Sequence, residues 1–335
     1  LLGFALAVML VAAGMGHAAA DSNEVNVYTY REAKLMAPLF EAFTKATGIK
    51  TNTIYIEKGL EERLKAEGAA SPADVVILVD AGRIINAAND GLFQPARSEI
   101  LAGAVPAQLR DADGQWFALT MRSRIVYASR DRVKQDAISY EDLADPKWKG
   151  KVCIRSGQHA YNNALFAGLI AKHGAAEGEK IIAGIKANLA KKPSGGDRDV
   201  AKDIAAGVCD VGLANTYYLG LMAGNSNEKA WADAVKPLKS TFRGGGTHVN
   251  ISAGAIAKHA PHKENAIKLL EFMVGAEAQA LYGDVNHEYP VRAGVEAAAT
   301  IKQFGPVSPD AMKLADIAAN QKNASQLVDK VAFDN

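Results

Sequence analysis

Short runs rich in β-branched residues alternate with longer stretches of helical period, and this alternation restricts the fold more than any other feature of the chain. Near the amino end, residues 25–29 are typical of a strand, 35–47 of a helix and 54–57 of a second strand. A charged helix over 60–68 and a buried strand over 73–80 follow. This βαβαβ order predicts a mainly parallel sheet with helices on both faces. Ligands of such sheets bind beyond the carboxyl ends of the strands.

A second unit of the same kind follows a β-rich stretch at 116–128. Strand-like runs begin there at Cys153 and Cys209, with helical periods between and after them, and a later strand over 249–257 is expected to return to the first unit. We therefore predict a two-lobe α/β protein whose lobes are joined by crossing strands. The predicted division is residues 21–120 plus 245–285 for the first lobe and residues 121–244 plus 286–335 for the second.

Composition limits the classes of function. The chain has 335 residues, of which 49% are hydrophobic and 22% charged, as expected for a soluble globular protein of about two domains. Its formal net charge is +1, so it lacks the charge excess typical of proteins that bind nucleic acid or anionic membranes. We expect neither as a partner.

The amino-terminal segment is apolar. Residues 1–16 carry no charge, and His17-Ala18-Ala19-Ala20 precedes Asp21. This order is typical of the apolar region and the Ala-x-Ala cleavage site of a secretory signal peptide, so we expect cleavage near Ala20 and export of the mature chain. The run is shorter than the roughly 20 residues of a membrane-spanning helix, which disfavours an uncleaved anchor.

Two cysteines, Cys153 and Cys209, each stand at the beginning of a strand-like run. Export permits a disulfide between them. Tyr161 lies eight residues after Cys153 and Tyr217 lies eight residues after Cys209, so pairing of the two strands would bring these tyrosines to the same edge. Two unlinked core cysteines are an equal alternative.

Tyr217 and Tyr218 are adjacent after an apolar run, where two phenols in a row serve packing poorly. A phenol with a pKa near ~10 is a poor ligand while protonated, but a highly charged cation displaces the proton. Ferric iron, which is hard and trivalent, suits anionic oxygen. Zinc and copper sites usually cluster His or Cys, and the seven histidines show no HxxxH spacing. The pair is a candidate metal site, and one packed tyrosine beside one surface tyrosine is the alternative.

Seven segments, spread over nearly all of the chain after residue 20, are specific when they are taken together. They are Val27-Tyr28-Thr29-Tyr30-Arg31, Ser71-Pro72-Ala73-Asp74-Val75, Gly91-Leu92-Phe93-Gln94-Pro95, Asp145-Pro146-Lys147-Trp148-Lys149-Gly150, Tyr161-Asn162, Asn215-Thr216-Tyr217-Tyr218 and Gly246-Thr247-His248-Val249-Asn250. In this combination the chain resembles the periplasmic iron-binding proteins of ABC importers. The resemblance implies the type II periplasmic-binding-protein fold, in which each lobe is a mainly parallel sheet flanked by helices and crossing hinge strands join the lobes.

The resemblance also implies which residues hold the metal. In that family tyrosines of the second lobe bind iron, and matching the motifs carries this role to Tyr161, Tyr217 and Tyr218. Three phenolates would formally neutralise Fe³⁺. Because they must lose their protons to bind, iron binding should weaken as the pH falls.

The first loop departs from part of the family. Many members have His-Tyr after the arginine, whereas this chain has Arg31-Glu32-Ala33. Because this loop has no tyrosine that could bind the metal, we expect a bound anion such as carbonate, or water, to complete the coordination of the iron. Arg31, Arg122 and Arg124 are the candidate anion-binding residues, because guanidinium groups match planar anions. Glu32 as a direct ligand, and surface ion pairs for Arg122 and Arg124, stay open.

The implied function is capture without catalysis. The lobes would close by hinge motion over Fe³⁺ and its anion in the periplasm, and a monomeric protein would deliver the iron to an inner-membrane ABC permease and its ATPase. A binding protein for ferrous iron, or for a small anion or organic ligand, is one alternative. An exported α/β enzyme is another, although the chain has no GxSxG nucleophile motif, Walker A loop or GxGxxG after the first strand.

Overall fold

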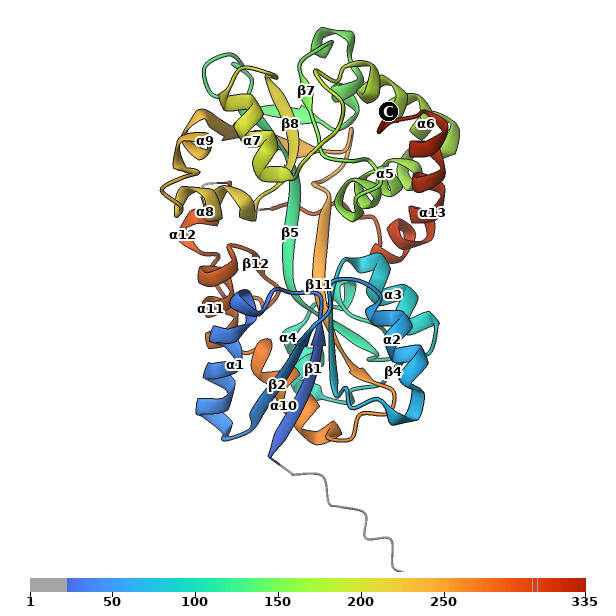
Figure 1. Ribbon diagram of the computed structural model, residues 1–335, viewed down its shortest axis with the longest axis vertical. Coiled ribbons are helices and arrows are strands. Elements are labelled where there is room, and N and C mark those ends of the chain that lie inside the picture. The colour runs from blue at the N-terminus through green and yellow to red at the C-terminus, as the bar shows by residue number, and fades with distance from the viewer. Residues whose placement is uncertain (1–22, 303, 306) are drawn as a thin grey trace, which may run out of the picture.

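Two long strands, β5 (Trp116–Ser129) and β11 (Val249–Ala257), run through the centre of the molecule and connect its two lobes (Figure 1). The computed structural model describes residues 23–335 except 303 and 306, so the predicted signal peptide of residues 1–20 lies outside the described residues. β5 and β11 pair with each other in antiparallel fashion. Both strands are buried along almost their whole length, as expected for the centre of a two-lobe structure.

The first lobe is built around β1 (Glu24–Thr29), which runs parallel to both β2 (Lys50–Tyr55) and β3 (Val75–Val79). β11 pairs with β3 in antiparallel fashion, so the sheet is mixed. The flanking helices of this lobe are α1 (Ala33–Thr47), α2 (Leu60–Glu67), α3 (Ala81–Asn89), α4 (Glu99–Ala104), α10 (Lys263–Met273) and α11 (Ala276–Asn286). Two short strands, β4 (Phe93–Gln94) and β12 (Tyr289–Pro290), pair with β11 and β5 respectively.

Helix α1 shows how local sequence sets an element of this lobe. Met36, Leu39, Phe40 and Phe43 recur at helical spacing and are buried, each contributing roughly 1.5–3 kcal/mol of burial free energy. The helix ends where Gly48 adopts a φ of 73° and its N–H donates to the carbonyl of Thr44. Leu35, at the start of the same helix, lines the space between the lobes.

The second lobe continues the central sheet. β8 (Val211–Asn215) pairs antiparallel with β5 and parallel with β7 (Val152–Cys153), while β9 (Val235–Pro237) also pairs with β5. A separate small sheet joins β6 (Ala137–Ser139) to β10 (Lys239–Thr241). The helices of this region are α5 (Ala160–His173), α6 (Ala175–Ala187), α7 (Asp197–Ala205), α8 (Tyr217–Ala223), α9 (Lys229–Ala234), α12 (Ala299–Lys302) and α13 (Leu314–Lys330).

A disulfide joins Cys153 in β7 to Cys209, which lies two residues before β8 begins, so the alternative of two unlinked cysteines is wrong. Cys153 pairs across the sheet with Gly212, and the bond therefore reinforces two strands that are already neighbours. Both sulfur-bearing residues are buried in the second-lobe core.

Within the described part of the chain, no helix is long and apolar enough to cross a membrane. The predicted lobe boundaries at residues 120, 245 and 285 stay predictions. One strand boundary was wrong: the sequence placed the second strand at 54–57, and the structure places β2 at Lys50–Tyr55. β2 lies at the edge of the sheet and is largely exposed, so its first residues lack an apolar pattern.

Candidate metal centre

The three predicted tyrosines meet where two second-lobe helices begin. Tyr161 lies in the first turn of α5, and Tyr217 and Tyr218 open α8. The phenol oxygens of Tyr161 and Tyr217 are 3.1 Å apart. The ring centroids of Tyr217 and Tyr218 are 4.3 Å apart, with a tilt of 31° between the rings. The chain thus gathers three phenols into one cluster.

Backbone structure on either side holds this cluster in place. The imidazole Nδ1 of His159 accepts a hydrogen bond from the backbone N–H of Tyr161 at the amino end of α5. The same ring packs edge-on against the Tyr161 ring, with centroids 4.5 Å apart. On the other side, Thr216 lies between β8 and α8, and its N–H donates to the carbonyl of Ser123 on β5. Both tyrosine-bearing helices therefore start from anchored positions.

The electrostatics of the cluster favour protonated phenols in the absence of a cation. Burial raises the pKa of Tyr217 well above its ordinary value, and the neighbouring phenols Tyr161 and Tyr218 raise it further. Burial also raises the pKa of Tyr218 to about 12, with additional contributions from Tyr161 and Asp197. Phenols with such pKa values are neutral at pH 7, so only a cation of high charge could replace their protons.

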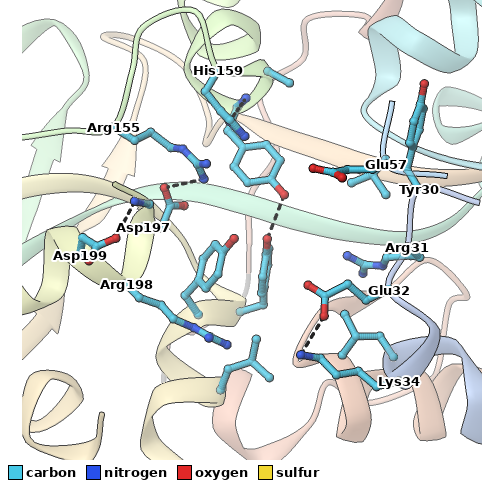
Figure 2. A pocket seen from close by; sticks show the side chains of 18 of the residues that line it. Tyr30, Arg31, Glu32, Lys34, Glu57, Arg155, His159, Asp197, Arg198 and Asp199 are labelled. Carbon is cyan, nitrogen blue, oxygen red and sulfur yellow. Dashed lines mark hydrogen bonds and ion pairs between the residues drawn. The ribbon is translucent and has the colours of Figure 1, made fainter. Parts of the chain in front are cut away.

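The cluster opens into a cleft of about 520 Å³ between the lobes. Figure 2 shows Arg155, His159 and Arg198 on the second-lobe side, and Arg31 and Glu57 on the facing first-lobe side. Residues of α1 and α3 complete the first-lobe wall. A bound ion would therefore contact the second lobe directly and face the first lobe across the cleft.

Arg124 lies beside the cluster but already has protein partners. Its guanidinium carbon is 5.9 Å from the centroid of the Tyr161 ring. Nε and Nη2 donate to the side-chain oxygen of Asn162, and Nη1 donates to Asp197 and Asn215. With 2% of its side chain exposed, Arg124 is held inside the second lobe rather than paired at the surface.

Within the part of the chain that the structure describes, Arg122 has fewer hydrogen-bond partners than the other two predicted arginines. It is 1% exposed, and its guanidinium carbon is 5.5 Å from the Tyr161 ring centroid. Nη1 donates to the hydroxyl of Ser252 at 3.3 Å. Nη2 is a buried donor with no hydrogen-bond partner among the described residues. A buried donor of this kind is costly to leave unpaired, so it is suited to an incoming anion.

Arg31 stands on the first-lobe side and is tied to a carboxylate. Its Nη2 is bonded to Glu288, which is fully buried, and its Nε is 3.4 Å from the hydroxyl of Tyr282. Glu288 also accepts a hydrogen bond from Thr120. Glu32, the alternative ligand, is exposed at the cleft and pairs with Lys34 at 2.8 Å.

The sequence reasoning missed two further arginines. The guanidinium carbon of Arg155 lies 5.2 Å from the Tyr161 ring centroid, and that of Arg198 lies 5.8 Å from the Tyr218 ring centroid. Arg155 also pairs with the buried carboxylate of Asp197. Position in the chain offered one signal, because Arg155 follows β7 just as Arg31 follows β1, at the ends of strands where ligands bind.

The described residues offer little for a metal site built from His, Cys or carboxylate ligands. The described residues contain no group of three or more His, Cys, Asp or Glu side chains that could hold a metal ion. His248 is buried away from solvent and packs edge-on against Phe242, as expected for a structural role. The phenol cluster is therefore the candidate centre, and its all-oxygen chemistry suits a hard cation.

Known proteins resemble this chain over nearly its whole length. Iron uptake protein A1 of Synechocystis sp. is 39% identical over 93% of this chain and 88% of its own length. The solved structure of a Bordetella ferric binding protein is 54% identical, covers 93% of this chain and 100% of its own, and has a TM-score of 0.88. A Trichodesmium protein solved in complex with iron and citrate ligands is 41% identical over 92% of this chain and 99% of its own, with a TM-score of 0.87.

These structures confirm the predicted type II periplasmic-binding-protein fold. A family model described as bacterial extracellular solute-binding protein matches residues 70–308, which is more than half of the chain. The chain belongs to the bacterial extracellular solute-binding proteins.

Proposed function

We propose that this protein captures ferric iron in the cleft between its lobes through the phenolates of Tyr161, Tyr217 and Tyr218. The observation that carries the proposal is the cluster itself, in which the Tyr161 and Tyr217 phenol oxygens are 3.1 Å apart at a cleft between two lobes. Three phenolates match the charge of Fe³⁺. The names of the iron uptake and ferric binding relatives support the same cargo.

An anion completes the shell in this proposal. The unpartnered Nη2 of Arg122 supports a role for this residue as the direct anion donor. Arg31 and Arg124 are held by carboxylate and amide oxygens, so we assign them a longer-range part through their positive charge. Carbonate fits a planar guanidinium fork, and the citrate in the Trichodesmium complex shows that a relative accepts a carboxylate.

Capture and delivery follow from the two-lobe form. Iron and anion bind the second lobe first, and the first lobe then closes over them about the crossing strands. The closed monomer delivers iron in the periplasm to a membrane permease that a partner ATPase drives. The relative named as an Fe(3+)-binding periplasmic protein of Serratia marcescens supports this location.

A visible absorption titration tests the proposal. Metal-stripped protein without residues 1–20 is titrated with a ferric chelate in bicarbonate buffer. We expect a broad phenolate-to-iron band that saturates at one equivalent. Tyr217→Phe and Tyr218→Phe should each weaken or remove the band, whereas Tyr55→Phe, which alters an exposed tyrosine on β2, should leave it unchanged.

The outcomes separate the candidate cargoes. Absence of the band in the unaltered protein rejects the ferric site and favours ferrous iron or a small anion as ligand. Equal bands in Tyr217→Phe and Tyr55→Phe would show that iron binds elsewhere. Arg122→Gln should retain the band but require more ferric chelate for saturation, because it removes the donor that we assign to the anion.

A further inference from the structure

Helix α13 contacts both lobes along one flank of the molecule. It lies against α5 of the second lobe, and its amino-terminal half reaches α3 of the first lobe (Figure 1). The contact with α3 centres on Gln321. Its side-chain Nε2 donates to Oδ1 of Asp80 at 3.0 Å, and its backbone carbonyl accepts from the side-chain amide of Asn163 on α5 at 3.1 Å.

The carboxylate of Asp80, which follows the last residue of β3, accepts several hydrogen bonds. Its Oδ1 also accepts from the N–H groups of Gly82 and Arg83, and its Oδ2 accepts from Asn250 on β11 at 2.6 Å. Asp80 is 1% exposed and has a φ of 135°, a strained value for a residue with a side chain. Such strain persists only where the surroundings fix the residue, and Gln321 is one of those contacts.

Gly82 provides the room for this contact. A Cβ atom added at Gly82 would lie 2.0 Å from Oε1 of Gln321 and 2.4–2.5 Å from the rest of its carboxamide. The far end of a glutamine side chain can move, so a methyl group at this position would displace the carboxamide from Asp80. The close fit therefore depends on the absence of a side chain at residue 82.

The contact joins the two walls of the cleft. Asp80 lies between Val79 and Arg83, which both line the first-lobe wall. Asn163 lies two residues after Tyr161, which belongs to the second-lobe wall. Hydrogen bonds thus connect Asn163 of α5 through Gln321 of α13 to Asp80, which caps the amino end of α3.

We propose that Gln321 is a positioning residue whose bond to Asp80 holds the lobes together and slows the loss of cleft-bound iron. This inference rests on the proposed function for its cargo, but the effect of the Gln321–Asp80 bond on lobe separation can be measured without iron. In this proposal the hydrogen bond from Gln321 to Asp80 breaks when the lobes separate, because α13 stays packed against α5 of the second lobe. Weakening it should therefore favour the open form and accelerate release.

Two variants break the hydrogen bond between Gln321 and Asp80 in different ways. Gln321→Glu places a carboxylate against Asp80, and Gly82→Ala displaces the carboxamide without altering it. Asn323→Asp is the matched control, because it adds the same charge to an exposed position of α13. Gly82→Ala should not destabilise α3 itself, because alanine is favoured over glycine in a helix by up to about 1 kcal/mol.

The measurements are the radius of gyration of the metal-free proteins by X-ray scattering and the rate of iron loss to a competing chelator. We expect Gln321→Glu and Gly82→Ala to have larger radii than Asn323→Asp and to lose iron about tenfold faster, which corresponds to the lower end of the range for one hydrogen bond to a charged group. The position of the phenolate band should stay the same, which separates lobe closure from damage to the tyrosines. Radii equal to the control, or iron loss within twofold of it, would overturn the inference. The radii decide it even if the ferric band is absent.

Discussion

Removal of the Cys153–Cys209 disulfide should destabilise the protein by an amount set mainly by the length of chain that it closes. The two cysteines are 56 residues apart in sequence, and the loop includes α5, α6 and α7. In the chain-entropy account, a cross-link restricts the unfolded chain more as this loop lengthens. A loop of this length corresponds to about 4 kcal/mol, between the values for 15 and 100 residues.

The magnitude is large relative to total stability. Proteins are typically stable by about 5–15 kcal/mol, so loss of the cross-link would remove a quarter or more of the free energy of unfolding. The folded state should change little, because β7 and β8 stay paired through Val152↔Val211 and Cys153↔Gly212. We therefore expect the substituted protein to fold and to show the same phenolate band with ferric iron.

Urea unfolding of Cys153→Ala, Cys209→Ala and the double variant measures the effect in metal-free protein. Either single substitution already breaks the cross-link, so each should lower the free energy of unfolding by about 4 kcal/mol. The double variant should add only the effect of one more lost sulfur atom, and the unfolding slope should rise because the unfolded chain is less restricted. Additive single effects, or losses below about 1 kcal/mol, would refute the argument.

Three further predictions concern ionisable groups. Burial raises the pKa of Tyr282, so above about pH 10 the unfolded chain loses a proton that the folded chain keeps, and urea midpoints should fall as the pH rises. Burial lowers the pKa of His248 to about 3, so between about pH 6.5 and 3 the unfolded chain protonates this imidazole and the folded chain does not. The urea midpoint should therefore decrease as the pH is lowered through this range, and it should decrease less steeply in His248→Gln. Glu288→Gln leaves the charge of Arg31 buried without its carboxylate and should cost about 3 kcal/mol in urea unfolding, whereas the exposed Glu32→Gln should cost under about 1 kcal/mol.

The alternation of strands and helices was sufficient to predict the α/β class, because buried strands carry a strong apolar signal. β3 and β11 are buried at nearly every position, and their sequence runs matched the structure closely. β2 was misplaced since an edge strand with an exposed face needs no apolar pattern. The antiparallel pairing of the crossing strands also could not be predicted, because it depends on which distant segments meet.

The candidate site shows the same limit. Tyr161, Tyr217 and Tyr218 were predicted from motif and spacing, and the structure brings them together. The partners of the arginines were not predictable, because Asp197 and Glu288 are far from them in sequence. Sequence reasoning identifies which side chains could bind, whereas the fold decides which of them are already occupied.

The arrangement of β5 gives a physical reason to assign the anion to Arg122. Arg122 and Arg124 lie two residues apart and both approach the Tyr161 ring, but Arg124 is bonded to second-lobe residues while Arg122 is bonded to Ser252 of β11. Ser252 pairs with Val79 in the first-lobe part of the sheet. Neighbouring guanidinium groups are thus held from opposite lobes. Under the proposed function, an anion on Nη2 of Arg122 would therefore link the phenol cluster to a strand that pairs with the first-lobe sheet, and anion binding and lobe closure would stabilise each other.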